Sequence, residues 1–562
     1  MEEQLMLAAL VAVFLAGAAG VILYQKAKRN QWLYRKIRNT YGKWPEREYE
    51  YDEFEAISHY FRLRRKNQET FTLDDITWND LEMDKIFMLL NHTWSSVGES
   101  CLYALLRTPC FSEEELKRRD QLIRFFETHS KQREKLEFFF ANVGKSGRRS
   151  MYDYIYNLAD QEPSPVWKEL IWTAGIALCV GGIFFKPEAA VPSLIAVMAF
   201  AWGDYYKKKR KIEPYIMSCA YLLHVLKNAE KLENMELGPG AEYVEKMKAA
   251  RKRLDGFKHH TFFVMAGSGT DNLSGGLEKM LLDYVNFTFH LDLIQFSGLI
   301  REIQKNLDAF EELTENMGML ECATALASFR TMMPEHCTPK FSDRAEIQAE
   351  NLYHPLIQEP VKNSLHVSRG VLLTGSNASG KSTFLKTVAV NAILAQTVYT
   401  CMADSFETSF FQVYSSMALR DDLTGKESYY IVEIRSLKRV LDALGKGCHV
   451  LTFVDEVLRG TNTVERIAAS SQILKSMCRP DSLCFAATHD IELTYILEKE
   501  YENFHFQEEV KEDEVLFDYS LRKGRATSRN AIRLLHVMGY PDAVIEKAEE
   551  RAEHFLETGN WT

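Results

Sequence analysis

The chain has 562 residues, of which 46% are hydrophobic and 26% charged, a composition typical of a globular protein of more than one domain and unlike that of a disordered chain. Its formal net charge of −10 excludes a broadly basic surface, so any contact with nucleic acid must depend on a local basic patch. The ten cysteines form no C-x-x-C pair and no cluster with histidine at zinc spacing, which predicts reduced thiols and no metal site built on cysteine.

The first predicted element is an apolar helix. Leu5 to Tyr24 is a run of twenty residues without a charge, about 30 Å long as a helix, which is enough to cross a bilayer core. The next segment, Gln25 to Trp44, has seven Lys or Arg and no acid, which predicts that it lies in the cytoplasm. A cleaved signal peptide is the alternative, but its positive charges would precede the apolar run. We therefore expect a retained transmembrane anchor.

Two further apolar runs predict a hairpin of helices. Leu170 to Phe185 and Ala189 to Gly203 are separated by "KPE", and each is about 23 Å long as a helix. A buried hairpin in a soluble core is one interpretation of runs this short. Trp and Tyr residues near their ends and the basic run Lys207 to Lys211 favour a membrane hairpin instead. Together with the first run, this predicts a multi-pass protein of the cell membrane whose large C-terminal part is cytoplasmic.

The regions on either side of this hairpin predict long helices. Asp74 to Phe140 and Tyr215 to Met333 have apolar residues at spacings of three and four and few prolines. From Leu352 onward the pattern changes, and short apolar runs such as "GVLLTG", "GCHVLTFVDE" and "SLCFAATHD" alternate with helical stretches. That alternation is typical of a parallel sheet covered by helices. The sequence thus predicts a helical core followed by an α/β domain.

A phosphate-binding loop opens the α/β domain. Gly375, Gly380, Lys381 and Ser382 satisfy G-x-x-x-x-G-K-[ST] between a strand that ends at Thr374 and a helix. Glycine lets the loop wrap a phosphate, the lysine supplies positive charge to the β- and γ-phosphates, and the serine hydroxyl can bind Mg²⁺. ATP and Mg²⁺ are the expected cofactors, and the predicted ATP-binding residues are Gly375, Ser376, Asn377, Ala378, Ser379, Gly380, Lys381, Ser382 and Thr383.

Acidic residues follow a second buried strand. "HVLTFVDEV" ends in Asp455 and Glu456, and at the edge of a parallel sheet the first carboxylate would join Ser382 at Mg²⁺ while the second lies beside an attacking water. An exposed turn after an edge strand is the alternative. A third strand, "LCFAATH", ends in His489, whose imidazole could bind the γ-phosphate or serve only as a satisfied polar group. These residues predict an ATP hydrolase.

Five stretches, in order, resemble the MutS family of ATPases, relatives of the ATP-binding-cassette fold. They are "TGSNASGKST", "DDLTGKESYYIVEI", "FVDEVLRGTNT", "ATHDIELT" and "LRKGRATSRNAIRLLHVMGYPDAVIEKA". "NLYHPLI" is similar to the family's lead-in to the ATPase domain, and Thr77 to Pro109 is similar to the start of its helical core. The expected fold class is an α/β C-terminal P-loop ATPase domain preceded by a mainly helical core with transmembrane helices.

The resemblance implies roles for individual residues. Asn377 would face the γ-phosphate, Glu456 would activate water, and His489 would be the switch histidine. Ser428 falls where the family places a serine that reaches the nucleotide of the opposite subunit, so a homodimer would share two composite sites. The predicted segments are 1–25, anchor; 26–73, basic linker; 74–165, first part of the helical core; 166–206, transmembrane hairpin; 207–345, lever and clamp-like helices; 346–525, ATPase domain; and 526–562, dimerisation helices.

The sequence also departs from the family pattern. In the loop, small residues replace the usual Pro, Met and Gly at Ser376, Ala378 and Ser379, and Gly425 is displaced by one residue ahead of Ser428. The family's Ser-Tyr-Gly is missing near Arg529 to Ala531. Before Asp74 we expect no domain that inserts an aromatic residue into mismatched DNA. The prediction is therefore a membrane-anchored variant that lacks the mismatch-reading domain.

Two functions are consistent with these motifs. In the first, a membrane-anchored dimeric ATPase couples hydrolysis to binding of double-stranded DNA, with doubtful specificity for mismatches. In the second, the same dimeric ATPase acts on a protein or lipid substrate as a transporter-like or remodelling machine. The basic clusters Lys26 to Lys43 and Lys207 to Lys211 favour lipid contact, whereas Lys246 to His260 could touch DNA phosphates. Protein partners are not identifiable from the sequence.

Overall fold

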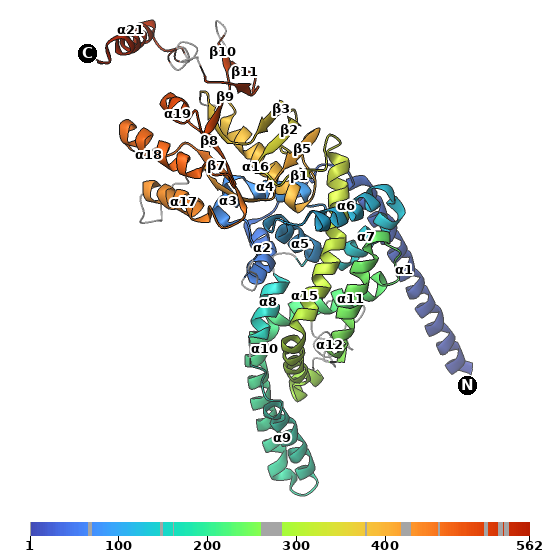
Figure 1. The fold of residues 1–562 in the computed structure, drawn as a ribbon. Helices are drawn as coiled ribbons and strands as arrows, with labels where there is room; N and C mark the ends of the chain where they lie inside the picture. Colours follow the sequence, from blue (N-terminus) through green and yellow to red (C-terminus); the bar gives the residue numbers. More distant parts are fainter. Residues whose placement is uncertain are drawn as a thin grey trace. The chain divides into compact units, whose positions relative to one another are not determined.

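The computed structural model contains two compact units, and each unit is assembled from segments that are discontinuous in sequence (Figure 1). The first unit comprises Met1–Glu69, Asn91–Ala104 and Gln121–Met332, and the second comprises Thr70–Leu90, Leu105–Asp120 and Met333–Thr562. The structure describes residues 2–65, 70–146, 150–160, 162–259, 284–376, 379–417, 429–458, 461–510, 515–526, 532, 535 and 539–561.

The first unit is helical in its described residues. α15 contributes much of its core, because buried residues such as Leu313, Met317 and Leu320 recur at spacings of three and four along it. This helix is kinked at Asn306, where φ is −129° and ψ is 27°. The helices of this unit are α1 (Glu2–Thr40), α2 (Tyr51–Arg65), the first part of α5 (Ser96–Arg107), the last part of α6 (Glu113–Thr128), α7 (Ser130–Val143), α8 (Met151–Ala159), α9 (Trp167–Ile183), α10 (Pro187–Leu232), η1 (Gly238–Gly240), α11 (Ala241–Arg253), α12 (Asp255–His259) and α15 (Leu291–Met332).

Two glycines let α5 and α15 pack closely in the first unit. A Cβ atom at Gly98 would lie 2.2 Å from Oε2 of Glu321, and one at Gly318 would lie 2.5 Å from Cβ of Cys101. The buried Glu321 carboxylate accepts hydrogen bonds from the backbone N–H groups of Trp94 at 2.6 Å and Ser95 at 2.8 Å. Burial raises the pKa of Glu321 to about 7. This buried acid therefore joins the turn before α5 to the middle of α15.

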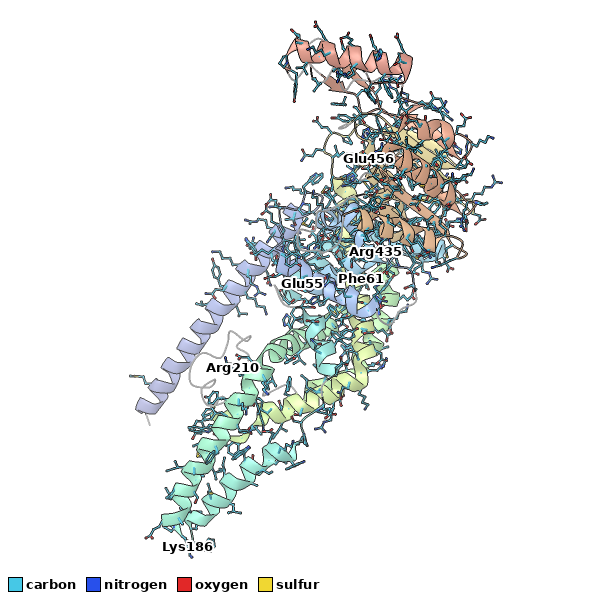
Figure 2. All side chains as sticks on the ribbon, turned by 90° about the vertical axis from the view of Figure 1, so that its left-hand side faces the viewer. Glu55, Phe61, Lys186, Arg210, Arg435 and Glu456 are labelled. Atoms are coloured by element: carbon cyan, nitrogen blue, oxygen red, sulfur yellow. The ribbon has the colours of Figure 1, made fainter. Side chains whose placement is uncertain are left out.

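The helices α9 and α10 form a hairpin whose tip is Lys186, with Arg210 farther along α10 (Figure 2). Charged side chains are buried at its base. Glu169 is only 3% exposed, and its carboxylate lies 2.7 Å from Nδ1 of His290 and 2.7 Å from Nζ of Lys208. Lys208 also lies 2.6 Å from Asp204. Glu169, Asp204 and His290 have the donor types of a metal site, but the Lys208 ammonium already contacts both carboxylates.

The predicted membrane attachment is wrong. Among the helices that the structure describes, none is both long enough and apolar enough to cross a bilayer. α9 has 17 residues, the lower limit of the roughly 17–25 that a span needs, and the apolar part of α10 ends at Asp204 before a run of lysines. The run from Leu5 to Tyr24 belongs to α1, which continues through the basic segment to Thr40. The predicted anchor, transmembrane hairpin, membrane partner and multi-pass localisation are withdrawn, and the fold class is corrected to a mixture of helical and α/β parts.

The second unit contains a six-stranded sheet of order β12-β9-β4-β8-β7-β6 (Figure 1). Neighbouring strands are parallel except for the pair β12 and β9. The central strands are buried along nearly their whole length and are nearly continuously apolar, as expected for parallel strands covered on both faces. The strands are β4 (Gly370–Thr374), β6 (Phe411–Ser416), β7 (His449–Asp455), β8 (Ser482–Ala487), β9 (Tyr501–His505) and β12 (Arg522–Lys523).

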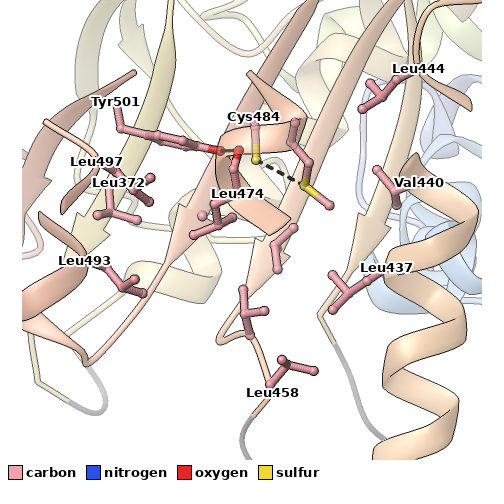
Figure 3. Packing of buried hydrophobic residues seen from close by; sticks show 14 of the residues in the cluster. Leu372, Leu437, Val440, Leu444, Leu458, Leu474, Cys484, Leu493, Leu497 and Tyr501 are labelled. Carbon is pink, nitrogen blue, oxygen red and sulfur yellow. Dashed lines mark hydrogen bonds between the residues drawn. The ribbon is translucent and has the colours of Figure 1, made fainter. Parts of the chain in front are cut away.

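Helices cover both faces of this sheet (Figure 1). α16 (Lys381–Thr397) lies on one face, and α17 (Tyr429–Ala443), α18 (Thr463–Met477) and α19 (Ile491–Ile496) lie on the other. Figure 3 shows the second interface, where Leu437 and Val440 of α17 and Leu474 of α18 pack with sheet residues such as Leu372 and Cys484. Since these residues are at most 2% exposed, this apolar layer holds the strand ends that carry the predicted site.

The remaining elements of the second unit lie before, between and after the strands of this sheet along the chain. A four-stranded sheet has the order β1-β5-β2-β3, and β10 pairs with β11 in a hairpin. At the start of α3, the Asp74 side chain accepts a hydrogen bond from Thr77 N–H at 2.8 Å, a typical helix cap. These elements are α3 (Asp75–Asp80), α4 (Met83–Leu90), β1 (Lys340–Phe341), β2 (Ile347–Leu352), β3 (Asn363–Val367), β5 (Ser405–Thr408), β10 (Glu508–Val510), β11 (Val515–Phe517) and α21 (Asp542–Thr558).

Candidate functional site

The predicted phosphate loop joins β4 to α16 in the second unit. Gly375 follows β4 with φ of +145°, and a Cβ atom there would lie 2.9 Å from the backbone oxygen of Phe506. Gly380 has φ of +102° and immediately precedes α16, which begins at Lys381. Glycine is favoured at both positions because side chains rarely adopt these backbone angles. The loop thus ends at a helix N-terminus, which favours bound anions.

Lys381 lies inside this loop. Its side chain is 6% exposed, and Nζ donates hydrogen bonds to the backbone oxygens of Gly375 at 2.8 Å and Ser376 at 2.7 Å. Ser379 is 2% exposed, and its hydroxyl oxygen is buried without a hydrogen-bond partner among the described residues. A buried, unsatisfied hydroxyl in a loop that also holds an ammonium group fits a ligand that supplies acceptor oxygens, such as a phosphate.

The loop and the end of β7 meet at Ser382 and Asp455. The Ser382 hydroxyl donates a hydrogen bond to Oδ2 of Asp455 at 2.5 Å. The sheet register explains this meeting, because β8 lies between β4 and β7 and Ala487 pairs with both Leu373 and Asp455. A hydroxyl and a carboxylate are oxygen ligands of the kind that Mg²⁺ prefers. These two residues therefore fit the predicted Mg²⁺ site.

Glu456 has an unusual backbone conformation. Its φ is +58°, while its N–H donates a hydrogen bond to the backbone oxygen of Ala487 at 3.0 Å. For a residue with a side chain this left-handed conformation costs about 1–2 kcal/mol, and such strain is common at functional sites. Oε1 of Glu456 lies 3.0 Å from Nε2 of His489, which follows β8. The turn thus holds a carboxylate and an imidazole together at the same edge of the sheet.

Neighbouring contacts hold this pair in place. The N–H of Leu458, which also has φ of +58°, donates to Oε1 of the buried Glu433 at 2.5 Å. Arg466 donates two hydrogen bonds to Asp490, at 3.0 and 2.6 Å, and Asp490 directly follows His489. Hydrogen bonding to this carboxylate raises the pKa of Arg466. A two-point contact of this kind restricts the backbone beside the histidine.

A cavity of about 570 Å³ opens over the loop, within the range of small-molecule sites. Among the residues that line it are Ser379, Gly380, Lys381, Ser382, Thr383 and Glu456 from the predicted site. Asp455 is hydrogen-bonded to the lining residue Ser382, and His489 lies next to the lining residue Glu456. Asn377, Ala378 and Ser428 lie outside the described residues.

The opposite wall of the cavity was not predicted. Its side chains include His354, Ile357, Val361, Phe506 and Tyr519, which form a largely apolar surface. Burial lowers the pKa of His354 to about 4, so its ring is neutral at pH 7 and its Nδ1 accepts a hydrogen bond from the N–H of Leu356 at 3.3 Å. The segment "NLYHPLI" was a usable signal for His354 and Ile357. Nothing in the sequence marked Tyr519, which reaches the cavity through tertiary folding.

Comparisons with known proteins match this part of the chain. Residues 371–556 match the family model described as MutS domain V. The chain is 29% identical over 258 residues to the DNA mismatch repair protein MutS of Thermus thermophilus, which covers 45% of this chain and 31% of that protein. It is 29% identical over 270 residues to the DNA mismatch repair protein MutS of Thermotoga maritima, covering 46% and 33%. It is 27% identical over 281 residues to MutS protein homolog 4 of Homo sapiens, covering 47% and 29%.

The α/β part of the chain is therefore similar to domain V of the MutS family. The family model covers the phosphate loop, Asp455, Glu456 and His489. The matched regions span about a third of the length of these relatives. The similarity therefore concerns part of each relative and does not extend to the whole of those proteins.

Proposed function

We propose that the second unit binds ATP with Mg²⁺ and hydrolyses it. The observation that carries this proposal is the meeting of two pairs at one edge of the sheet, Ser382 with Asp455 at 2.5 Å and Glu456 with His489 at 3.0 Å. The first pair has the oxygen ligands of a Mg²⁺ site, and the second has the form of a general base with an orienting imidazole. The MutS relationship of this region supports the same activity.

Each residue has a distinct task in this proposal. Lys381 neutralises the β- and γ-phosphates, together with the N-terminus of α16. Ser382 and Asp455 hold Mg²⁺, which stabilises negative charge on the phosphates when it is bound. Glu456 takes a proton from the attacking water, while His489 keeps the carboxylate oriented toward it.

The site roles that depend on the resemblance belong to this proposal as well. Asn377 would contact the γ-phosphate, and Ser428 would complete the site of a second chain in a homodimer. Ser428 directly precedes α17, whose Glu433 contacts the turn after Glu456. The contact between α17 and the turn after Glu456 supports a link between dimer formation and hydrolysis.

We propose double-stranded DNA as the substrate to which hydrolysis is coupled. The support is the similarity to proteins named DNA mismatch repair protein MutS. Mismatch specificity is not part of the proposal, because the match covers only about a third of the relatives' length. The alternative of a membrane ATPase is not proposed again, because none of the described helices is long and apolar enough to span a bilayer.

Nucleotide binding tests the first part of this function. Replacing Lys381 with Ala removes a charge-assisted contact, so the affinity for Mg-ATP should fall about tenfold or more. Lys475→Ala is the control, because Lys475 lies on α18 and pairs with Glu500 outside the cavity. Equilibrium binding of a fluorescent ATP analogue measures both. Equal affinities of the two variants would contradict the role of Lys381.

DNA binding is tested separately with the full chain. Duplex DNA of matched and mismatched sequence should bind with an affinity that falls as salt rises, and ATP should change that affinity. Fluorescence anisotropy at several salt concentrations measures both effects. Absence of binding at low salt, with and without ATP, would reject the DNA substrate while leaving the ATPase proposal in place.

A further inference from the structure

Two cysteines of the second unit lie directly opposite each other. Cys337 precedes β1 and Cys401 precedes β5, and both are free thiols. The N–H of Cys337 donates a hydrogen bond to the backbone oxygen of Cys401 at 2.9 Å, and the N–H of Cys401 donates one to the backbone oxygen of Cys337 at 2.9 Å. The two residues form an antiparallel pair outside the named strands. Exchange of both hydrogen bonds fixes the spacing of such a pair.

This spacing suits a disulfide bond. Opposite residues that exchange both hydrogen bonds have Cα atoms about 5.5 Å apart, within the range of about 4.4–6.8 Å found in disulfides. Their Cβ atoms lie on the same face, up to about 5.5 Å apart, whereas a disulfide brings them to about 3.5–4.5 Å. Closing the bond therefore requires a small approach of the two backbones. The strain stored in this way makes a disulfide easier to reduce again.

The two thiols differ in their access to solvent. Cys337 is partly exposed, whereas Cys401 is 0% exposed and its Sγ donates a hydrogen bond to the backbone oxygen of Asn391 at 3.6 Å. A reagent in solution therefore reaches Cys337 first. Burial, with a contribution from Asp404, raises the pKa of Cys337 to about 11, so the group is a protonated thiol before it reacts. Its reaction is slow at pH 7, although each thiolate that forms is a strong nucleophile.

Tyr353 connects this cysteine pair to the cavity over the phosphate loop. Its backbone N–H donates a hydrogen bond to the backbone oxygen of Met402 at 3.0 Å, and Met402 follows Cys401. Its hydroxyl donates a hydrogen bond to the backbone oxygen of Glu335 at 2.7 Å, two residues before Cys337. Tyr353 itself lines the cavity. Both halves of the cysteine pair are thus joined to one residue of the cavity wall.

The two sides of the pair are held with different strength. On the Cys401 side, the fully buried Asn391 accepts a hydrogen bond from the N–H of Met402 at 2.6 Å and donates one to the backbone oxygen of Tyr353 at 3.1 Å. On the other side, Glu335 pairs with Lys362 at 2.5 Å, and its side chain is 62% exposed. Exposed ion pairs contribute little stability. Closing a disulfide should therefore move the segment of Glu335, which holds the Tyr353 hydroxyl.

We propose that Cys337 and Cys401 form a reversible disulfide by exchange with a small-molecule disulfide, and that this bond weakens nucleotide binding in the adjacent cavity. The effect on binding rests on the proposed ATPase function, whereas formation of the bond does not. The bond would alter the cavity wall at Tyr353, away from the phosphate loop.

The exchange takes place in two steps. The Cys337 thiolate attacks one sulfur of the small disulfide, whose S–S bond breaks, and the first small thiol leaves after taking up a proton. Cys401 then gives up its proton and attacks the Cys337 sulfur of the mixed disulfide, and the second small thiol leaves with that proton. Two protein thiols are oxidised to one disulfide, while one small disulfide is reduced to two thiols.

The bond is tested on the full folded chain with oxidised glutathione. After incubation, the remaining thiols are blocked with iodoacetamide before unfolding, and the digested chain is analysed by mass spectrometry. A peptide pair joined through Cys337 and Cys401 is expected, and it should disappear after incubation with excess reduced glutathione. Glutathione retained on Cys337 without a link to Cys401 would overturn the proposal, and so would a link that excess reduced glutathione leaves intact.

Variants tie the bond to nucleotide binding. Cys337→Ser removes the partly exposed thiol, and Cys448→Ser is the matched control because it removes an exposed thiol outside the pair. Oxidation should weaken binding of a fluorescent ATP analogue about fivefold or more in the parent and in Cys448→Ser, and should leave Cys337→Ser unchanged. Equal affinities of the oxidised and reduced parent would overturn the effect on binding. Absence of binding by the reduced parent would reject the ATPase function as well, while mass spectrometry still decides on the bond.

Discussion

Glu456 shows how a single residue departs from local preference to serve a site. A residue with φ of +58° at the end of a buried strand is unfavourable unless the surrounding contacts fix it. Those contacts come from Ala487 and His489, which lie on the neighbouring strand and its loop. The sequence predicted the carboxylate and the histidine separately. Their distance of 3.0 Å depends on the strand order, which no local pattern contains.

The buried carboxyl of Glu137 should make the stability of the protein depend on pH. Its folded-state pKa of about 8 lies above its ordinary value, because burial outweighs the nearby Arg133, and Glu134 and Glu321 act in the same direction as burial. Between about pH 4.5 and pH 8 the folded protein keeps a proton that the unfolded chain has lost, so the free energy of unfolding falls as pH rises through this window. Gln has no such dependence. Glu137→Gln should therefore be more stable than the parent at pH 9, by on the order of 3 kcal/mol.

The difference in the free energy of unfolding between Glu137→Gln and the parent should shrink as pH falls toward 4.5. Chemical unfolding of the first unit, followed at pH 5 and pH 9, measures it. Glu134→Gln is the control on the same helix, since Glu134 is paired with Arg38 and its loss should give no gain at pH 9. A stability difference between Glu137→Gln and the parent that does not change with pH would contradict the assignment of a buried neutral carboxyl.

Some helices, strands and loops could be predicted from the sequence pattern, whereas others depend on tertiary contacts. The apolar runs that became β4, β7 and β8 were visible because parallel central strands are apolar on both faces. The phosphate loop was visible because its glycines and lysine recur at fixed spacing. The segment that contributes Tyr519 was not visible in the sequence, since its position at the cavity depends on contacts between distant parts of the chain. The apolar runs of α9 and α10 were misinterpreted, because hydropathy alone does not reveal the buried Glu169 network.

Packing of α5 against α15 gives the prediction at this scale. Gly98→Ala would place a methyl group 2.2 Å from the Glu321 carboxylate and should lower stability by about 1–3 kcal/mol through overpacking. Gly203→Ala is the matched control, because Gly203 lies inside α10 with no atom within 4 Å of a Cβ there. The control should be neutral or stabilised by up to about 1 kcal/mol. Thermal unfolding of both variants measures the contrast, and equal melting temperatures would contradict this packing.

The chain forms two compact units that are each assembled from separate segments, whereas the sequence predicted domains that follow one another along the chain. Thr70–Leu90 and Leu105–Asp120 belong to the second unit, although they come early in the chain and carry the helical pattern of the first. A periodicity identifies a helix without identifying the core that it joins. The proposed seven-segment division therefore needs an independent test such as limited proteolysis.

A shared site predicts that ATPase activity depends on the assembly of two chains. If Ser428 completes the site of a partner chain, then mixing Lys381→Ala chains with Ser428→Ala chains should form heterodimers with one intact composite site. Part of the ATPase activity that each variant lacks should return. Activity should also rise with protein concentration in the parent. Activity that is independent of concentration, together with no rescue on mixing, would reject the shared site.

In the proposed ATPase reaction, Glu456 activates the water that attacks ATP. Glu456→Gln keeps the size of the side chain and its hydrogen bonding but removes the base, so Mg-ATP should still bind with near-parental affinity. Its hydrolysis, measured as phosphate release under single-turnover conditions, should be slower by about 100-fold or more. Parental hydrolysis rates in this variant, with binding unchanged, would contradict the role of Glu456 as the base.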